Sequence, residues 1–275
     1  MRAPAAPTTR TLRDTEDVEF ACVERNLRDS FRILARHSRS GEVREYDGVS
    51  IASAGVAFQM FNAAFLSSPV ESEADLERRI AICTVHFRMR GLDWAWWVCE
   101  NWLPEALQSR ARQMFRDRRL HLSVELPGMV AEELPAPRRA LPALDVRRVR
   151  GGPVRDDFCA IGSVCFNVPL PWFQEVFAAS TVWDEFVCWV GYLGGEPVST
   201  AATVTSGGVV GIYNVATLPG HQRRGYGEVV MRHAVAAAQR EHGFTRTILQ
   251  STSQGFRLYE RLGYRTVAKV AVYSS

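Results

Sequence analysis

The sequence predicts an α/β (α+β) protein in which a mixed central sheet is flanked by helices. Some segments repeat apolar residues at the spacing of a helix, and others alternate apolar and polar residues as strands do. The two halves also resemble one another. Residues 55–62 and 207–214 both begin with glycine and end with an aromatic residue and asparagine, and the same offset pairs Gly91 with Gly243. We therefore expect one fold duplicated in tandem.

Composition restricts the class of protein. The chain has 275 residues, 47% of them hydrophobic, and no apolar run approaches the roughly 18 residues of a membrane-spanning helix. A net charge of only +3 gives little support to nucleic-acid binding. The N-terminus lacks the apolar core of a secretory signal, so we expect a cytoplasmic protein. Neither the cysteines nor the histidines have metal-ligand spacing, and we expect no metal site.

Changes in composition divide the chain into four parts. Residues 1–14, rich in proline, alanine and threonine, are expected to form a disordered tail. A first domain is expected at 15–126 and a second at 145–275, with the proline-rich stretch 127–144 as the linker between them.

Each domain is expected to mix helices and strands. In the first, helices are expected from Thr15 and at 73–90 and 105–118, and strands at 43–52, 56–61, 94–99 and 121–126. In the second, helices are expected at 156–165, 172–179, 226–242 and 255–262, and strands at 145–150, 186–193, 197–205, 209–217, 246–250 and 265–273. Gly91 directly after the helix at 73–90 is a typical helix end.

The clearest local signal is the turn that follows the strand at 209–217. From Leu218 to Gly227 it reads Leu-Pro-Gly-His-Gln-Arg-Arg-Gly-Tyr-Gly. Glycines let a ligand approach the backbone, and unpaired N–H groups at a helix N-terminus favour phosphate oxygens by roughly 0.3–2 kcal/mol per interaction. Arg223 and Arg224 add positive charge. At this point a glycine-rich loop that only helps a helix to pack is an equal alternative.

The turn resembles the Gln/Arg-x-x-Gly-x-Gly/Ala signature of the GNAT superfamily of N-acetyltransferases, which Gln222 to Gly227 match. The strand 211–217, the helix after the turn, and the segment 258–264 resemble the same family in order and spacing. The resemblance covers residues 145–275. It implies a GNAT-like fold and transfer of an acyl group from coenzyme A.

In GNAT proteins the strand before the signature holds the pantetheine arm through its backbone, and the turn binds the pyrophosphate. The resemblance therefore implies acetyl-CoA as the acyl donor. The implied cofactor-binding residues are Val215, Ala216 and Thr217 on the strand and Gln222, Arg223, Arg224, Gly225, Tyr226, Gly227 and Glu228 in the turn. Many relatives have an asparagine that touches the cofactor where this chain has Thr252 and Ser253, whose hydroxyls are the candidate substitutes.

For catalysis, the resemblance matches Tyr259 to the family tyrosine that protonates the departing thiolate. A phenol with a pKa of about 10 stays protonated at neutral pH, and the departing thiolate resembles an ordinary thiol with a pKa of about 8.5, so proton donation is feasible. The alternative is a tyrosine packed on a helix with its hydroxyl satisfied. Some relatives carry a glutamate where this chain has Gly211, so the general base is not identified. Asn214 is a candidate for orienting the substrate, or for satisfying backbone groups of its strand.

The first half resembles a degenerate GNAT domain. Residues 66–75, between its strand and helix, contain no glycine and carry three acidic side chains, which repel phosphate. Phe115 is the nearest counterpart of Tyr259 and has no hydroxyl. We therefore expect one coenzyme A per chain, bound in the C-terminal half.

The acceptor is the least defined part of the prediction. Residues 169–173 are candidates for its pocket, as are Trp94, Trp96 and Trp97, although core packing is the favoured interpretation for the tryptophans. A small-molecule amine and a peptide both fit as acceptors, and the sequence does not indicate the oligomeric state.

The function predicted from the sequence is direct transfer of an acetyl group from acetyl-CoA to a primary amine. Two alternatives stay open. A non-catalytic acyl-CoA sensor or interaction protein would explain the missing glutamate at Gly211. A transferase with a longer acyl-CoA would have the same motifs, because pocket depth cannot be derived from them.

Overall fold

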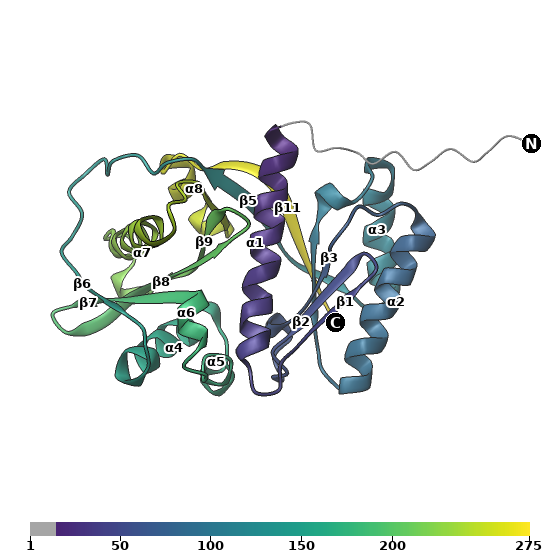
Figure 1. The fold of residues 1–275 in the computed structure, drawn as a ribbon, viewed down its shortest axis with the longest axis horizontal. Coiled ribbons are helices and arrows are strands. Elements are labelled where there is room, and N and C mark those ends of the chain that lie inside the picture. Colours follow the sequence, from purple (N-terminus) through teal and green to yellow (C-terminus); the bar gives the residue numbers. More distant parts are fainter. Residues whose placement is uncertain (1–14) are drawn as a thin grey trace, which may run out of the picture.

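The computed structural model describes residues 15–275, so the tail expected at 1–14 lies outside the described residues. Every strand joins one mixed sheet, in the order β1-β2-β3-β4-β11-β5-β10-β9-β8-β7-β6. The expected mixed central sheet flanked by helices is therefore confirmed (Figure 1).

The elements of both halves follow the expected alternation. The first half contains α1 (Thr15–His37), β1 (Glu42–Tyr46), β2 (Val49–Ser53), η1 (Gln59–Phe61), β3 (Asn62–Leu66), α2 (Glu73–Arg90), β4 (Ala95–Cys99), η2 (Glu100–Trp102), α3 (Glu105–Asp117) and β5 (His121–Ala131). The second contains β6 (Asp145–Arg148), α4 (Gly152–Phe166), α5 (Leu170–Val176), α6 (Val182–Glu185), β7 (Phe186–Leu193), β8 (Glu196–Ser206), β9 (Val209–Thr217), η3 (Pro219–His221), α7 (Tyr226–His242), β10 (Thr247–Gln250), α8 (Ser253–Arg261) and β11 (Arg265–Ser274).

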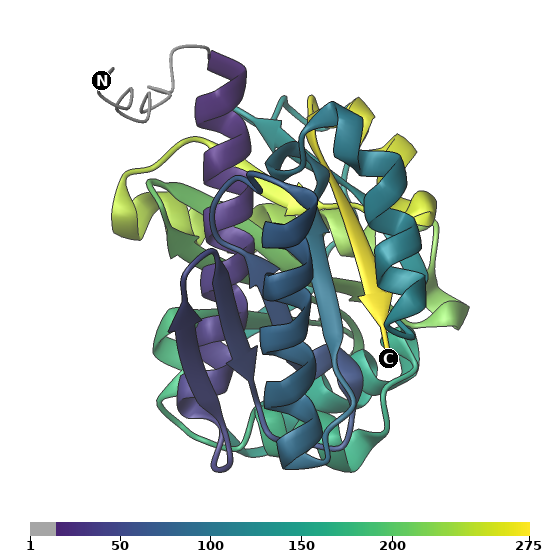
Figure 2. The same ribbon diagram turned by 90° about the vertical axis from the view of Figure 1, so that its right-hand side faces the viewer.

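Helices cover both faces of the sheet. One face packs against α2 and α3 in the first half and α7 and α8 in the second, and the other face packs against α1 and α4 to α6. Figure 2 shows α2 and α3 in front of the strands and α1 behind them. Side chains alternate between the two faces, so Trp96 is buried with α2 and α3 while Trp97 is buried with α1. Helix α1 contacts strands of both halves.

The two halves exchange their last strands. β5, which ends the first half, pairs with β10 and β11, and β11, which ends the chain, pairs with β4 and β5. From one edge of the sheet the order runs β1 to β4 and then β11, and from the other it runs β6 to β10 and then β5. Each half therefore completes its part of the sheet with a strand from the other half.

The exchanged strand β11 carries side chains into the core of the first half. Tyr273 packs on Phe115 with ring centroids 4.5 Å apart, and Phe115 packs on Trp96 at 5.8 Å. Trp94, Trp96 and Trp97 are all buried, which confirms that they pack in the core. The aromatic core of the first half thus depends on the last residues of the second.

Several elements lie where the sequence predicts them. Helix α2 has the expected bounds and ends at Gly91, which has the left-handed φ of 62° that glycine adopts without strain. Strand β9 and helix α7 also match, and Gly243 ends α7 with a φ of 75°. Gly91 and Gly243, which are paired in the sequence repeat, therefore occupy equivalent positions at the ends of α2 and α7.

The prediction of strands at 43–52 and 56–61 is wrong. A hairpin turn at Asp47-Gly48, with a φ of 77° at Gly48, divides the first of them into β1 and β2. Residues 56–61 form a loop that ends in η1, and β3 begins only at Asn62.

The asparagines of the sequence repeat are not equivalent. Asn62 begins β3 before its ladder with β4, and its side-chain amide donates to the backbone oxygens of Val56 (2.8 Å) and Asp93 (2.9 Å). Asn214 lies beyond the last pair of β9 with β10. The duplication is therefore supported by strand order and helix positions, and not by these two residues.

The stretch expected as a linker has a defined path. Residues 127–131 belong to β5, and we call the remainder, residues 132–144, the connecting segment. It runs along the α7–α8 side of the second half, as the teal trace on the left of Figure 1 shows. A Cβ added to Gly263 would lie 3.6 Å from Pro135, and one added to Gly191 would lie 3.0 Å from Leu144. The segment therefore contacts the second half near both of its ends, while residues 135–140 are exposed.

Because the halves share strands, we expect them to unfold together. Phe115→Ala removes the ring between Trp96 and Tyr273 and should lower the free energy of unfolding by about 3–5 kcal/mol. Val164→Ala, at an exposed position, is the control and should change it by less than about 0.5 kcal/mol. Calorimetry should give one transition that shifts as a whole. A first half that melts separately, with the second half unchanged, would contradict this interpretation.

Candidate functional site

The parallel ladder between β9 and β10 ends early. It joins residues 210–212 to residues 247–249, while β9 continues to Thr217. From Tyr213 onward β9 stays paired with β8 on its other edge. The structure gives residues 213–217 no partner on the edge that faces β10. Backbone groups on this edge are therefore available to a ligand.

A β-bulge at Asn214 sets the direction of this free edge. Asn214 has a φ of 48°, and the register of β9 against β8 shifts between the pairs Thr200–Ala216 and Ala202–Tyr213. Asparagine tolerates the left-handed region better than most residues, and the hydroxyl of Thr200 donates to the Asn214 carbonyl oxygen at 2.8 Å. The structure therefore shows that Asn214 contributes to the site through its backbone conformation.

The turn after β9 presents backbone N–H groups at the start of α7. Arg223 and Gly225 have φ values of 62° and 89°, and such alternation of backbone conformation makes a concave anion-binding nest. Residues 226–228 form the first turn of α7, where N–H groups have no partner within the helix. No hydrogen bond among residues 15–275 uses the N–H groups of residues 223–225. The turn can therefore bind phosphate oxygens.

Contacts within the turn fix it against the end of β9. The Gln222 side-chain amide donates to the Thr217 carbonyl oxygen at 3.2 Å. A Cβ on Gly227 would lie 3.1 Å from the hydroxyl oxygen of Thr217 and 3.8 Å from Val215, so glycine permits this close packing of helix on strand. The strand and turn predicted to hold the cofactor are thus one continuous surface.

Tyr259 lies on α8 beside the end of β10. A Cβ on Gly255 would lie 3.0 Å from the Tyr259 ring and 3.4 Å from the hydroxyl oxygen of Ser251, the residue after β10. Tyr259 is 9% exposed, and its hydroxyl makes no hydrogen bond with a described residue. By contrast, the Tyr264 hydroxyl lies 2.7 Å from that of Thr247. Tyr259 is therefore the tyrosine of this pair that is free to act on a ligand.

Burial raises the pKa of Tyr259 to about 12. Removal from water disfavours the charged phenolate, so the neutral phenol persists at and well above neutral pH. The group can therefore donate a proton and does not act as a base under these conditions.

Thr252 and Ser253 begin α8. The Thr252 hydroxyl oxygen is the N-cap and accepts from the Gly255 N–H at 3.3 Å, and both side chains are exposed. The helix start thus uses the Thr252 oxygen as an acceptor and leaves its proton available.

The space beside Gly211 belongs to the first half. A Cβ on Gly211 would lie 1.9 Å from the side-chain oxygen of Asn26, a fully buried residue of α1. The Asn26 amide donates to the carbonyl oxygens of Val204 and Ser206, and its oxygen accepts from the Tyr213 hydroxyl at 2.6 Å. The site where some relatives carry glutamate is thus filled by an asparagine from α1, which sequence reasoning did not find.

Gln250 is a second residue that the sequence did not indicate. It ends β10 and pairs with Gly128, whose added Cβ would meet Val23 of α1, so Gln250 faces the α1 side of the sheet. Its side-chain nitrogen is buried without a hydrogen-bond partner. An unpaired buried amide costs roughly 1–3 kcal/mol and is a favourable place for a ligand oxygen. In the sequence, the only signal for Gln250 was that a polar residue follows the apolar residues of the strand.

The first half lacks the same opening. β3 pairs with β4 as far as Phe65–Trp97 and ends one residue later at Leu66, so it has no counterpart of the free end of β9. The region expected to repel phosphate, 66–75, leads into α2 through the N-cap Ser72. Both features agree with a degenerate half.

The aromatic residues expected near the acceptor pack between the two halves. Phe58 lies 5.8 Å from Trp172, and Phe61 lies 6.0 Å from Phe173, between ring centroids. Phe173 is buried, whereas Trp172 is partly exposed. The loop before β3 therefore supports α5, the helix next to the predicted acceptor side.

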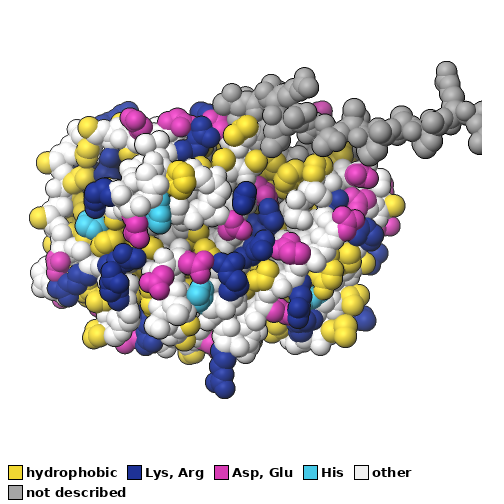
Figure 3. All heavy atoms as spheres, viewed as in Figure 1, with side chains coloured by type: hydrophobic (Ala, Val, Ile, Leu, Met, Phe, Trp, Pro, Cys, Tyr) yellow, Lys and Arg dark blue, Asp and Glu magenta, His cyan; other side chains and the backbone are white. Residues whose placement is uncertain are grey.

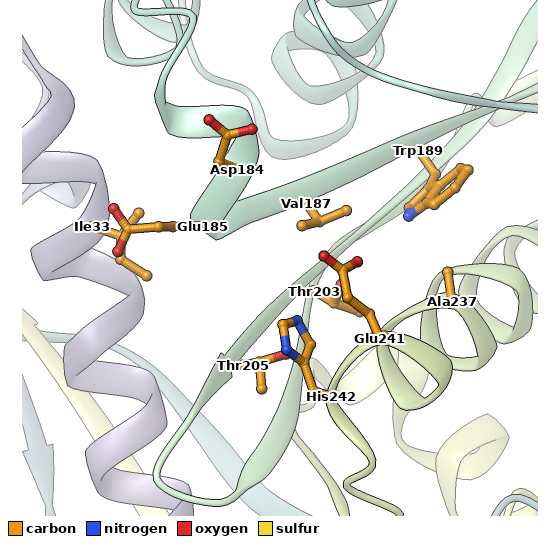
Figure 4. A pocket seen from close by; sticks show the side chains of 11 residues that line it. Ile33, Asp184, Glu185, Val187, Trp189, Thr203, Thr205, Ala237, Glu241 and His242 are labelled. Atoms are coloured by element: carbon orange, nitrogen blue, oxygen red, sulfur yellow. The ribbon is translucent and has the colours of Figure 1, made fainter.

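Two cavities lie away from this site. One, of about 150 Å³, is at the C-terminal end of α7 (Figure 4), and its carboxylates come from Asp184, Glu185 and Glu241. Glu185 is already paired with Arg36 at 3.0 Å and His37 at 2.8 Å. The second, of about 450 Å³, borders α1. Neither contains a residue predicted to bind the cofactor or to act in catalysis.

The arginines of α1 are neutralised by neighbouring carboxylates. Figure 3 shows basic and acidic side chains side by side on the face that α1 occupies. The pairs, all within 3.8 Å, are Arg25–Asp29, Arg28–Glu24, Arg32–Glu45 and Arg36–Glu185. This face is therefore a poor anion-binding surface compared with the turn at Arg223 and Arg224, which form no ion pair in the part of the chain that is described.

Known proteins are similar to this chain in sequence or in fold. Residues 184–266, which include β9, the turn, α7 and Tyr259, match the family model of the acetyltransferase (GNAT) domain. No curated protein sequence matches the chain. A GCN5-related N-acetyltransferase from Kribbella flavida has a TM-score of 0.69 at 18% identity, over 90% of this chain and 94% of its own.

Two further solved structures are similar over most of the chain. A functionally unknown conserved protein from Staphylococcus epidermidis ATCC 12228 has a TM-score of 0.61 at 14% identity, over 84% of this chain and 92% of its own. A tandem GNAT protein from the clavulanic acid biosynthesis pathway has a TM-score of 0.53 at 11% identity, over 82% and 78%.

Residues 184–266 of the second half match the GNAT acetyltransferase domain, and the fold of the chain agrees with that of a GNAT protein. The first half is GNAT-like, and the chain as a whole has the fold of tandem GNAT proteins. Within residues 15–275, no helix is both long and apolar enough to cross a bilayer. Nor do these residues contain a group of three or more side chains arranged to bind a metal ion.

We expect Gly211 to be required for full stability. Gly211→Ala would place a methyl group on the Asn26 amide and should lower the free energy of unfolding by about 1–3 kcal/mol. Gly220→Ala is the control, because no atom lies within 4 Å of its added Cβ. Urea unfolding of both variants measures the difference. Equal stability of the two would show that Asn26 does not occupy this space in solution.

Proposed function

We propose that the chain transfers an acetyl group from acetyl-CoA to a primary amine of a small molecule or peptide. The catalytic domain would be residues 145–275, preceded by a degenerate domain at 15–126 and joined to it through residues 127–144. The observation that carries the proposal is the continuity of the free β9 edge with the N–H groups of the turn. One surface offers backbone partners for pantetheine and, at its end, donors for pyrophosphate.

Each part of the cofactor has a proposed partner. Val215, Ala216 and Thr217 would bind the pantetheine amides through their backbone, and residues 222–228 would surround the pyrophosphate. Thr252 and Ser253, at the start of α8, border the opening from the β10 side. The thioester would then lie near the bulge, between β9 and Tyr259.

The reaction would proceed by direct attack of a neutral amine on the thioester carbonyl. Backbone N–H groups near Val215 would stabilise the negative charge that develops on the carbonyl oxygen. The carbon–sulfur bond then breaks, and Tyr259 donates its proton to the leaving thiolate. Tyr259 stays protonated at neutral pH, so its proton is available as negative charge develops on the departing sulfur.

Deprotonation of the amine would not use a carboxylate at position 211. Asn26 fills that space and Gly211 carries no side chain. An amine with a pKa of about 8–10 is partly neutral near neutral pH, and water can accept its proton. The rate should therefore rise with pH as the free amine becomes more abundant.

The acceptor would approach from the α1 side of the sheet. The α7–α8 side is occupied by those helices and by the cofactor surface, whereas Gln250 faces α1 with an unpaired amide nitrogen. Asn214 lies at the bulge between the two sides and is our candidate for orienting the acceptor.

A sensor that binds acyl-CoA without turnover is the second candidate. The specific observation in its favour is the occupation of the glutamate position by Asn26. A transferase for a longer acyl donor would differ from an acetyltransferase only in the depth of its thioester cavity. Rates with donors of increasing chain length would distinguish the two enzymes.

Tyr259→Phe should lower kcat by roughly 10²–10⁴-fold while the affinity for coenzyme A is kept, because only proton donation is lost. Tyr264→Phe is the control, since its hydroxyl is bonded to Thr247 and has no proposed role. Thiol release over a panel of amines measures the rate. Tight coenzyme A binding with no turnover on any amine would favour the sensor.

Calorimetric titration with coenzyme A should give one site per chain. Among residues 15–275, strand β9 of the second half has a free edge that leads into the turn, and its counterpart β3 in the first half does not. Arg223→Glu should weaken this binding, whereas Arg78→Glu, at the start of α2 in the first half, should not. A stoichiometry of two would contradict the assignment of a degenerate first half.

A further inference from the structure

The connecting segment brings another arginine to the phosphate-binding turn. A Cβ on Gly225 would lie 3.2 Å from Pro142 and 3.7 Å from the terminal nitrogen Nη2 of Arg139. Gly225 is the residue from which α7 begins, with a φ of 89°. The guanidinium group of Arg139 is therefore next to the backbone donors of the turn, although the two are far apart in sequence.

Arg139 has no protein partner in the structure. It is exposed, and no hydrogen bond or ion pair connects it to another residue between 15 and 275. The arginines of α1 differ, because each of them is paired with a carboxylate. A free guanidinium beside unpaired N–H groups is suited to an anion, since its planar fork can donate two parallel hydrogen bonds to phosphate oxygens.

Contacts on either side of Arg139 anchor the segment that carries it. Pro135 contacts the end of α8 near Gly263, Pro142 contacts Gly225, and Leu144 contacts Gly191. Leu134 and Leu144 also pack on the core of α7 and α8. Prolines fix their own backbone φ near −65°, so the backbone of the segment loses less conformational entropy when a ligand binds.

We propose that Arg139 binds the pyrophosphate of coenzyme A and closes the phosphate site from the side of the connecting segment. This proposal rests on the proposed function. Arg139 lies before residue 184, where the family match begins, so the interaction would be supplied by the connection between the halves. The phosphate partner is the pyrophosphate because Arg139 lies against Gly225, the centre of the turn.

Titration of the full chain with coenzyme A tests the proposal. Arg139→Ala should weaken binding by roughly five- to thirtyfold, the effect of one partly solvated charged hydrogen bond. Arg138→Ala is the matched control, because it removes the same charge one residue away and should change the affinity by less than about twofold. Arg139→Lys should fall between Arg139→Ala and the unaltered chain.

Two coenzyme A fragments identify the phosphate. Dephospho-coenzyme A retains the pyrophosphate and should show the same loss with Arg139→Ala, whereas pantetheine has no phosphate and should show none. A loss that disappears with dephospho-coenzyme A would assign Arg139 to the 3′-phosphate and overturn the proposal. So would equal losses for Arg138→Ala and Arg139→Ala, or no loss for either.

Failure of the proposed function gives a different result. If the unaltered chain does not bind coenzyme A, the cofactor assignment itself is wrong. If it binds coenzyme A and Arg139→Ala binds equally well, only the role of Arg139 is wrong. Thermal unfolding of each variant without ligand confirms that the exposed substitutions leave the fold intact.

Discussion

The exchange of β5 and β11 is the constraint on which the rest of the structure depends. Each strand closes the sheet of the half to which it does not belong, and the two pair with one another at the centre. Tyr273 completes the aromatic core around Phe115, so the first half cannot bury that core without the last strand of the chain. A degenerate half can therefore be retained for structural reasons alone, because its loss would expose the centre of a sheet that also positions β10.

The difference between the halves is one of strand length more than of motif. β9 runs past its ladder with β10 and turns at the Asn214 bulge, so backbone groups at its end remain unpaired. β3 ends one residue beyond its ladder with β4, and Trp97 and Phe65 pair at the corresponding position. A glycine-rich turn placed after β3 would still lack the free strand edge. The site thus needs the bulge and the turn together.

Local patterns predict much of this fold, although the Asp47-Gly48 turn was a local signal that the prediction missed. The other differences depend on contacts distant in sequence. The turn at Gln222–Gly227, helix α7 and strand β9 were predictable because glycine, helix periodicity and strand alternation act over a few residues. Strand exchange leaves no such trace, since β5 and β11 read as ordinary strands whichever half they join. The same holds for Asn26, a buried polar residue of α1 whose partner Gly211 is distant in sequence. Its burial follows from tertiary packing, which propensity does not encode.

The first half also acts on the site through direct contacts. Asn26 occupies the space beside Gly211 and bonds to Tyr213, the residue at which β9 leaves β10. On the same face of the sheet, Phe58 and Phe61 support the aromatic residues of α5. These contacts lie immediately before the bulge and beside the proposed acceptor side. If the acceptor enters there, as we propose, its pocket is built from both halves.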